Sequence, residues 1–230
     1  MPDPLTPGDD ATLARHLRNL GRMYPVLAHD LHAFLNTRVL NLELLQRAAA
    51  KEDPDPQTMA RIRRFAALVA DEIPPLDRML KAVVGQMRLS ETPGTRFDFR
   101  TLCEELAIVF DSYARYRRMR LKATLADVPM AVAGDRDAMA HALTALLLDM
   151  LEAAPQGTDL TLSLQADRRL ATLTLAAAPP AVLTREPAVP EGAAAAREVL
   201  ERYGARIDDS PGADGSSALG ITVPLVPLIS

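Results

Sequence analysis

The pair His29-Asp30 is the feature of this sequence best suited to chemistry. It lies in the run Leu27-Ala28-His29-Asp30-Leu31. On a helix, position 29 points about 200° away from positions 27 and 31, so a buried stripe through Leu27 and Leu31 leaves the His29 side chain in solvent. A neutral imidazole nitrogen is a nucleophile near pH 7, and a neighbouring carboxylate can orient it or take its proton. Most exposed helical histidines are simply solvated, so the rest of the sequence decides between the two interpretations.

Other chemistry-bearing residues are weaker candidates. His32 lies one turn after His29, but without further ligands nearby the two predict no metal site. His16 and His141 are expected on helix faces. The lone cysteine, Cys103, cannot form an internal disulfide and is expected as a small buried hydrophobe.

A basic cluster lies at the end of a predicted helix over residues 99–117. It contains Arg115, Arg117, Arg118, Arg120 and Lys122, with Tyr113 and Tyr116 alongside. We interpret it as a solvated helix end, because cations suit the C-terminal end of the helix dipole. The alternative is a docking surface for an acidic protein partner.

The composition is that of a globular protein with one or two cores. The chain has 230 residues, 48% of them hydrophobic, with 26 Lys plus Arg against 30 Asp plus Glu and a net charge of −4. Without a basic excess, no nucleic-acid partner is expected. The first 25 residues lack the basic start and apolar run of an export signal, and the apolar stretches are too short to span a bilayer. We therefore expect a cytoplasmic protein with no membrane partner, and the single cysteine fits a reducing compartment.

The first 92 residues predict a helical hairpin. Apolar residues recur at steps of three and four from the predicted N-cap Asp10 to Leu45, and again after the helix start Asp55-Pro56. Pro25 and the pair Pro74-Pro75 fall inside these runs, where a kink or a break is expected. Each apolar stripe is too long for one partner helix, so the hairpin is expected to complete a four-helix bundle by dimerising. A monomeric all-helical domain is the alternative.

Residues 95–230 predict a separate α/β domain, after a boundary in the turn-forming stretch 90–95. Helices are expected at about 99–117, 135–154 and 190–203. Strands are expected near 120–125, 158–166, 170–176, 206–208 and 218–224. This order indicates one mixed sheet with helices over one face.

Four segments, in this order, resemble the catalytic core of sensor histidine kinases. Residues 27–36 resemble the H-box, with Phe34 in place of the usual proline. Residues 97–102 resemble the entry to the ATPase domain, 134–139 the segment before its N-box helix, and 204–207 with 215–225 its last two strands. The resemblance implies an α+β fold, in which a dimeric four-helix hairpin for histidine phosphotransfer precedes an α/β sandwich of the GHKL (Bergerat) ATPase type. It also implies that His29 is the phosphoacceptor and Asp30 its orienting acid or base.

The ATP-binding boxes depart from the family pattern. Asp149 stands where the N-box has asparagine, and Ala177 begins Ala-Ala-Pro-Pro-Ala, where the family has Asp-x-Gly-x-Gly. Gly192 is the one glycine of the stretch 190–193, the counterpart of the phosphate-cradling turn. Because glycines allow close backbone approach to phosphate, we expect no nucleotide cofactor on this chain. Mg²⁺ is expected on a partner receiver. Ala33 replaces the Thr or Asn of bifunctional kinases, which argues against phosphatase activity.

Three functions are consistent with this pattern. The leading one is a histidine phosphotransferase of a phosphorelay, in which His29 exchanges a phosphoryl group with response-regulator receiver aspartates. The second is a pseudo-histidine-kinase adaptor that binds a receiver or a kinase without phosphotransfer, and the third is an active histidine kinase. Receivers, a second copy of the chain and an upstream hybrid histidine kinase are the expected partners.

Overall fold

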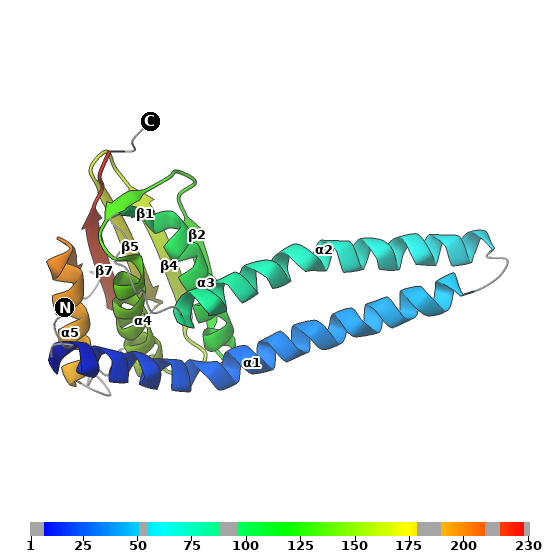
Figure 1. The fold of residues 1–230 in the computed structure, drawn as a ribbon, viewed down its shortest axis with the longest axis horizontal. Coiled ribbons are helices and arrows are strands. Elements are labelled where there is room, and N and C mark those ends of the chain that lie inside the picture. The colour runs from blue at the N-terminus through cyan, green and yellow to red at the C-terminus, as the bar shows by residue number, and fades with distance from the viewer. Residues whose placement is uncertain (1–6, 51–54, 88–95, 179–189, 210–216, 228–230) are drawn as a thin grey trace, which may run out of the picture.

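The computed structural model describes residues 7–50, 55–87, 96–178, 190–209 and 217–227. A long helical hairpin is followed by an α/β sandwich that sits against the base of the hairpin (Figure 1). The predicted fold class is thus confirmed. The predicted boundary at 90–95 and the polar stretch 51–54 lie outside the described residues.

The hairpin consists of α1 (Pro7–Ala49) and α2 (Pro56–Met87). Asp55 caps α2 as predicted, since its Oδ1 accepts the Thr58 amide at 2.6 Å. The prediction that Asp10 caps α1 is wrong: the helix begins at Pro7, because proline suits a first turn, where its missing N–H costs nothing. Both helices continue through their internal prolines, Pro25, Pro74 and Pro75.

The α/β sandwich contains three helices and two sheets. The helices are α3 (Phe99–Tyr116), α4 (Arg136–Ala153) and α5 (Pro190–Arg202). The main sheet has the strand order β2 (Arg120–Leu125), β4 (Asp159–Ala166), β5 (Leu170–Ala177), β7 (Ser217–Pro224) and β6 (Arg206–Asp208). Its β2–β4 pair is parallel and its other pairs are antiparallel, so the sheet is mixed, as predicted.

A small antiparallel pair, β1 (Arg96–Asp98) with β3 (Ala131–Ala133), was not predicted from the sequence. Each strand has three residues, which is too short to display a period of two. The pair stands at the entrance to the sandwich, where the Asp98 side chain accepts the Arg100 amide at 3.2 Å and the Met130 amide at 2.9 Å. Asp98 thereby caps α3 and fixes the loop before β3. These hydrogen bonds lower the pKa of Asp98, although burial opposes them more strongly than any single bond favours them.

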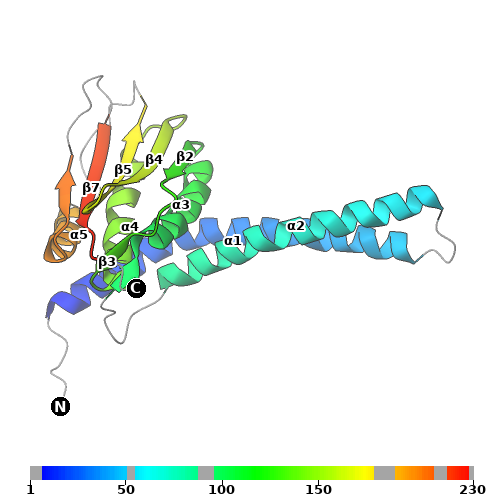
Figure 2. The same cartoon turned by 90° about the horizontal axis from the view of Figure 1, so that it is seen from above.

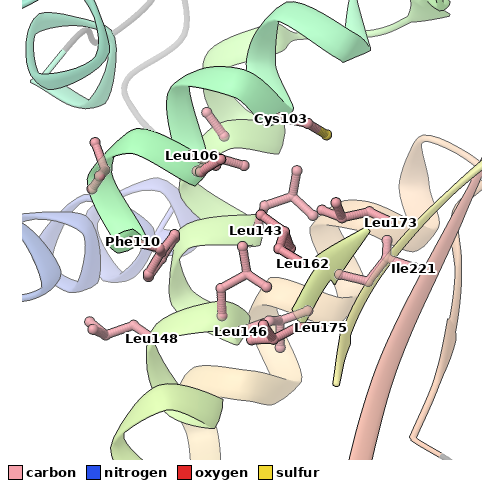
Figure 3. Close-up of a cluster of buried hydrophobic side chains, with 14 of the residues drawn as sticks. Cys103, Leu106, Phe110, Leu143, Leu146, Leu148, Leu162, Leu173, Leu175 and Ile221 are labelled. Atoms are coloured by element: carbon pink, nitrogen blue, oxygen red, sulfur yellow. The ribbon is translucent and has the colours of Figure 1, made fainter. Parts of the chain in front are cut away.

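One face of the main sheet is covered by α3, α4 and α5 (Figure 2). The inward side chains alternate along β4, β5 and β7, and they meet the apolar faces of α3 and α4 in one core (Figure 3). The labelled side chains of this core are Cys103, Leu106, Phe110, Leu143, Leu146, Leu148, Leu162, Leu173, Leu175 and Ile221. Cys103 is a buried hydrophobe, as predicted, and burial raises the pKa of its thiol.

The base of the hairpin belongs to the same core. Met23, Val26 and Leu27 of α1 and Ala82 and Val83 of α2 are buried in it. Helix α4 is accordingly buried around nearly its whole circumference, because the sheet lies on one side of it and the hairpin on the other. The far half of the hairpin extends beyond the sandwich (Figure 1). No helix in the described ranges is long and apolar enough to cross a bilayer.

Candidate functional site

His29 lies on α1 at the edge of the shared core. Leu27 is buried in that core and Leu31 packs against it, whereas the His29 side chain is 82% exposed, as the spacing predicts. Its Nδ1 is 3.3 Å from Asp30 Oδ1. An ionised carboxylate only accepts hydrogen bonds, so this contact is a hydrogen bond when Nδ1 carries the proton. In the neutral ring, Nε2 then keeps a free lone pair on the solvent side, which makes Nε2 the nucleophilic atom.

Asp30 connects the hairpin to the α/β sandwich. Its side chain is 21% exposed, and its Oδ2 is 3.2 Å from the Nη2 of Arg115, in the last turn of α3. Arg115 also contacts the Asp111 carboxylate at 3.4 Å and the Ser112 hydroxyl at 3.2 Å. Arg115 is thus an exposed cation at a helix end, as predicted, and the hairpin in addition supplies it with a carboxylate.

Other members of the cluster are paired within the sandwich. Arg120 meets Asp159 in a bidentate ion pair at 2.6 and 2.9 Å, and Arg117 donates to the Glu152 carbonyl at 3.4 Å. Tyr113 donates its hydroxyl to the Glu152 carboxylate at 2.9 Å. Three of the five cations of the cluster, Arg115, Arg117 and Arg120, thus have carboxylate or carbonyl partners.

The residues that follow His29 differ from the H-box pattern at Ala33 and Phe34. Phe34, at the position of the usual proline, is half-buried, and the Arg38 guanidinium lies 4.7 Å from its ring centroid. Arg38 also donates to the Glu72 carbonyl at 2.7 Å, just before the proline pair of α2. Ala33 and His32 are both exposed. Phe34, which replaces the proline, thus makes a cation–π contact with Arg38, and Arg38 in turn hydrogen-bonds across the hairpin to α2.

The first half of α1 crosses the outer face of α4. The rings of His16 and His141 stack there, with centroids 3.4 Å apart and an angle of 28° between them. His16 is 4% exposed, and it lines a small cavity with Asn19, residues of α4 and the alanines of α5. Burial, and after it the charge of His141, lower the pKa of His16 from 6.5 to about 4, against the smaller opposing effects of a hydrogen bond with the Gln86 backbone and of the Asp137 charge. Sequence spacing does not indicate this pair, since it predicts only that each histidine lies on a helix face.

Two polar contacts hold the hairpin base in place. Arg22 of α1 forms an ion pair with Glu152 of α4. Thr144 of α4 donates its hydroxyl to Gln86 of α2 at 2.7 Å, and both side chains are buried. The sandwich is therefore joined to the hairpin by apolar packing, by this buried hydrogen bond and by ion pairs at Arg22 and Arg115.

The positions of the three altered boxes lie in different elements. Asp149 is half-buried on α4, one turn beyond Ala145, which lines the cavity beside His16. Ala177 is buried at the end of β5, in register with Leu160 and Ser217. Gly192 lies in the first turn of α5, and residues 179–189 before it lie outside the described part. In the described ranges, no three His, Cys, Asp or Glu side chains gather as a metal ion would require.

No protein-family model matches the chain, and no curated protein matches it. Solved structures do match. The histidine kinase AdeS of Acinetobacter baumannii is 17% identical, with 86% of this chain and 98% of that chain covered and a TM-score of 0.47. The mycobacterial sensor histidine kinase MprB is 19% identical, with 58% of this chain and 98% of that chain covered and a TM-score of 0.44. The cytoplasmic segment of the histidine kinase QseC is 11% identical, with 65% of this chain and 92% of that chain covered and a TM-score of 0.45.

These structures are sensor histidine kinases, the family that the sequence motifs resemble. Their TM-scores are below 0.5 and their identities below 20%, so they decide nothing about activity. The architecture is defined by the chain's own elements: a helical hairpin that carries an exposed histidine, followed by a mixed sheet with helices over one face.

Proposed function

We propose that the chain is a histidine phosphotransferase of a two-component phosphorelay. In this proposal His29 accepts a phosphoryl group from the aspartate of one response-regulator receiver and passes it to the aspartate of another. The observation that carries the proposal is the exposed His29 imidazole, whose Nδ1 faces the Asp30 carboxylate at 3.3 Å and whose Nε2 is directed away from it.

The geometry suits the transfer without any proton leaving the histidine. Nε2 attacks the phosphorus of the receiver's aspartyl phosphate, and the P–O bond to that aspartate breaks with its electron pair on the carboxylate. The Nδ1 proton stays in place, and the imidazolium that forms faces the Asp30 carboxylate. Mg²⁺ bound to the receiver supplies charge stabilisation for the phosphoryl oxygens. The same steps in reverse deliver the group to a second receiver.

The altered ATP-binding boxes support the proposal that the chain transfers phosphate without binding ATP. Asp149 brings a carboxylate to the N-box position, and Ala177 brings a methyl group where the family carries an adenine-binding acid. The first half of α1 packs over α4 through the His16–His141 stack. His141 lies two turns before Asp149 on α4, so the two residues share one face of that helix. A kinase that phosphorylates His29 from ATP would need a different binding site.

The homodimer is supported by exposed apolar side chains on both hairpin helices. They include Ile73, Leu80, Val84 and Met87 on α2 and Leu35, Val39 and Leu42 on α1. Their spacing of three, four and seven residues aligns them along the helices, which suits a second hairpin of the same kind. A dimer would bury this stripe and leave two His29 side chains for receivers.

The test is phosphotransfer from labelled receivers. Wild type, His29→Ala and the control His32→Ala are each mixed with ³²P-labelled receivers of the source organism, and separately with γ-³²P-ATP. Label on wild type and on His32→Ala but not on His29→Ala, with none from ATP, is the expected result. Receivers that bind but transfer no label would favour the adaptor, and label from ATP would favour the kinase.

A further inference from the structure

We propose that Arg115 is a positioning residue for His29. Through Asp30, it holds the imidazole with Nδ1 towards the α/β sandwich and Nε2 towards the incoming phosphoryl group. The chemical consequence rests on the proposed phosphotransfer, whereas the orientation itself is a property of the protein alone. The sandwich would thus orient the histidine of the hairpin without binding nucleotide.

The two oxygens of Asp30 have different partners. Oδ1 faces His29 Nδ1 at 3.3 Å, and Oδ2 faces Arg115 Nη2 at 3.2 Å. Both contacts exist together in only one orientation of the carboxylate plane. A carboxylate without Arg115 turns about its χ angles in solvent and meets the imidazole only part of the time. The guanidinium therefore determines where the acceptor for the Nδ1 proton stands.

Arg115 is itself held by the sandwich. The Asp111 carboxylate and the Ser112 hydroxyl contact its guanidinium at 3.4 and 3.2 Å. Ser112 and the neighbouring residues Tyr113 and Ala114 belong to the last turns of α3 and are buried. The series α3, Arg115, Asp30, His29 thus connects a packed core to an exposed imidazole, which has no such packing of its own.

The ion pair is poorly placed for a mainly stabilising role. Arg115 is more than half exposed, and exposed ion pairs contribute little to stability. The hairpin base is held independently by the Arg22–Glu152 pair and the buried Thr144–Gln86 hydrogen bond. Removal of the Arg115 side chain should therefore change the orientation of His29 while the docked arrangement persists.

The experiment uses the full chain as Arg115→Ala and Arg115→Lys, with two controls. Arg120→Ala removes another arginine of the same cluster, whose partner Asp159 lies on the sheet. Arg22→Ala removes the other ion pair between hairpin and sandwich without touching Asp30. The first readout is the His29 tautomer from ¹⁵N NMR of the ring. The second is the rate at which phosphoramidate, a small phosphoryl donor, labels His29.

In wild type we expect the proton on Nδ1. In Arg115→Ala we expect the share of this tautomer to fall severalfold and labelling to slow about tenfold, as loss of an orienting group does. Arg115→Lys should restore much of both, and Arg120→Ala should match wild type. An unchanged tautomer in Arg115→Ala, or an equal change in Arg22→Ala, would overturn the inference. Because neither readout uses a receiver, it can fail or hold whether or not receivers transfer phosphate.

Discussion

Acid should release the first half of α1 from the sandwich by protonating His16. This side chain is buried against His141, where its pKa is about 4, compared with 6.5 for the free side chain. The docked state therefore binds a proton more weakly than the open state. Docking is unaffected well above pH 6.5 and loses free energy as the pH falls from there towards 4.

The size of the effect follows from the two pKa values. At pH 5 the open state is protonated at His16 and the docked state is almost entirely neutral. The difference amounts to about 2 kcal/mol relative to pH 7, or a roughly 20-fold rise in the population that exposes His16. The hydrogen bond with the Gln86 backbone and the charge of Asp137 oppose the shift and are already included in the value of about 4.

The assay is hydrogen–deuterium exchange at pH 7 and pH 5, corrected for the intrinsic exchange rates. We expect amides between about residues 16 and 27 to lose protection, because these residues include the buried face of α1. His16→Asn should remove most of the pH dependence, since asparagine does not titrate. His32→Asn, at an exposed position of the same helix, should retain it.

Equal loss of protection in wild type and His16→Asn between pH 7 and pH 5 would refute the role of His16. A loss in wild type that is spread evenly over α3 and the sheet would also refute it, because the contacts of His16 are the His141 ring of α4 and the Gln86 backbone of α2. A loss confined to α1 and the facing side of α4 is the specific signature of the stacked pair.

Two other perturbations test the packing and the assembly. Gly134→Ala should lower the unfolding free energy by about 1–3 kcal/mol, because φ is +137° there and a Cβ would lie 2.6 Å from the Tyr203 ring. Gly21→Ala, where nothing lies within 4 Å, should not destabilise the chain in the same urea titration. Ile73→Glu with Val84→Glu should turn the proposed dimer into a monomer in sedimentation equilibrium, with an unchanged circular dichroism spectrum. A folded double variant that remains dimeric would place the dimer interface elsewhere.

Most of the secondary structure could be predicted from the periodicity of apolar residues and from capping and turn residues. The predicted helices of the sandwich and the five main strands agree with the structure to within two residues. Their signals are local: alternating leucines along β4 and β5, the Asp135 cap of α4, and Gly204 after α5. The short β1–β3 pair has no such signal, and a helix capped by Asp10 would begin at residue 11, four residues after the actual start of α1 at Pro7.

The partners of the site could not be predicted, because sequence spacing contains no information about them. Arg115 is 85 residues from Asp30, and its local context indicated only a basic helix end. His16 and His141 were placed on helix faces without any indication that the two faces meet. By contrast, the exposure of His29 followed from the angle between its position and the apolar stripe, which is a property of one helix.

The apolar stripe of α1 has one period but two sets of partners. Along its far half it packs against α2, and along its near half it also packs against α3 and α4. Both sets are helices, and the same spacing of three and four residues suits either, so the stripe alone does not show where one set gives way to the other. His29 lies close to that change, beside the last α1 residues that reach the shared core. A hairpin separated from the sandwich would keep His29 and Asp30 but lose Arg115, the contact that fixes their orientation.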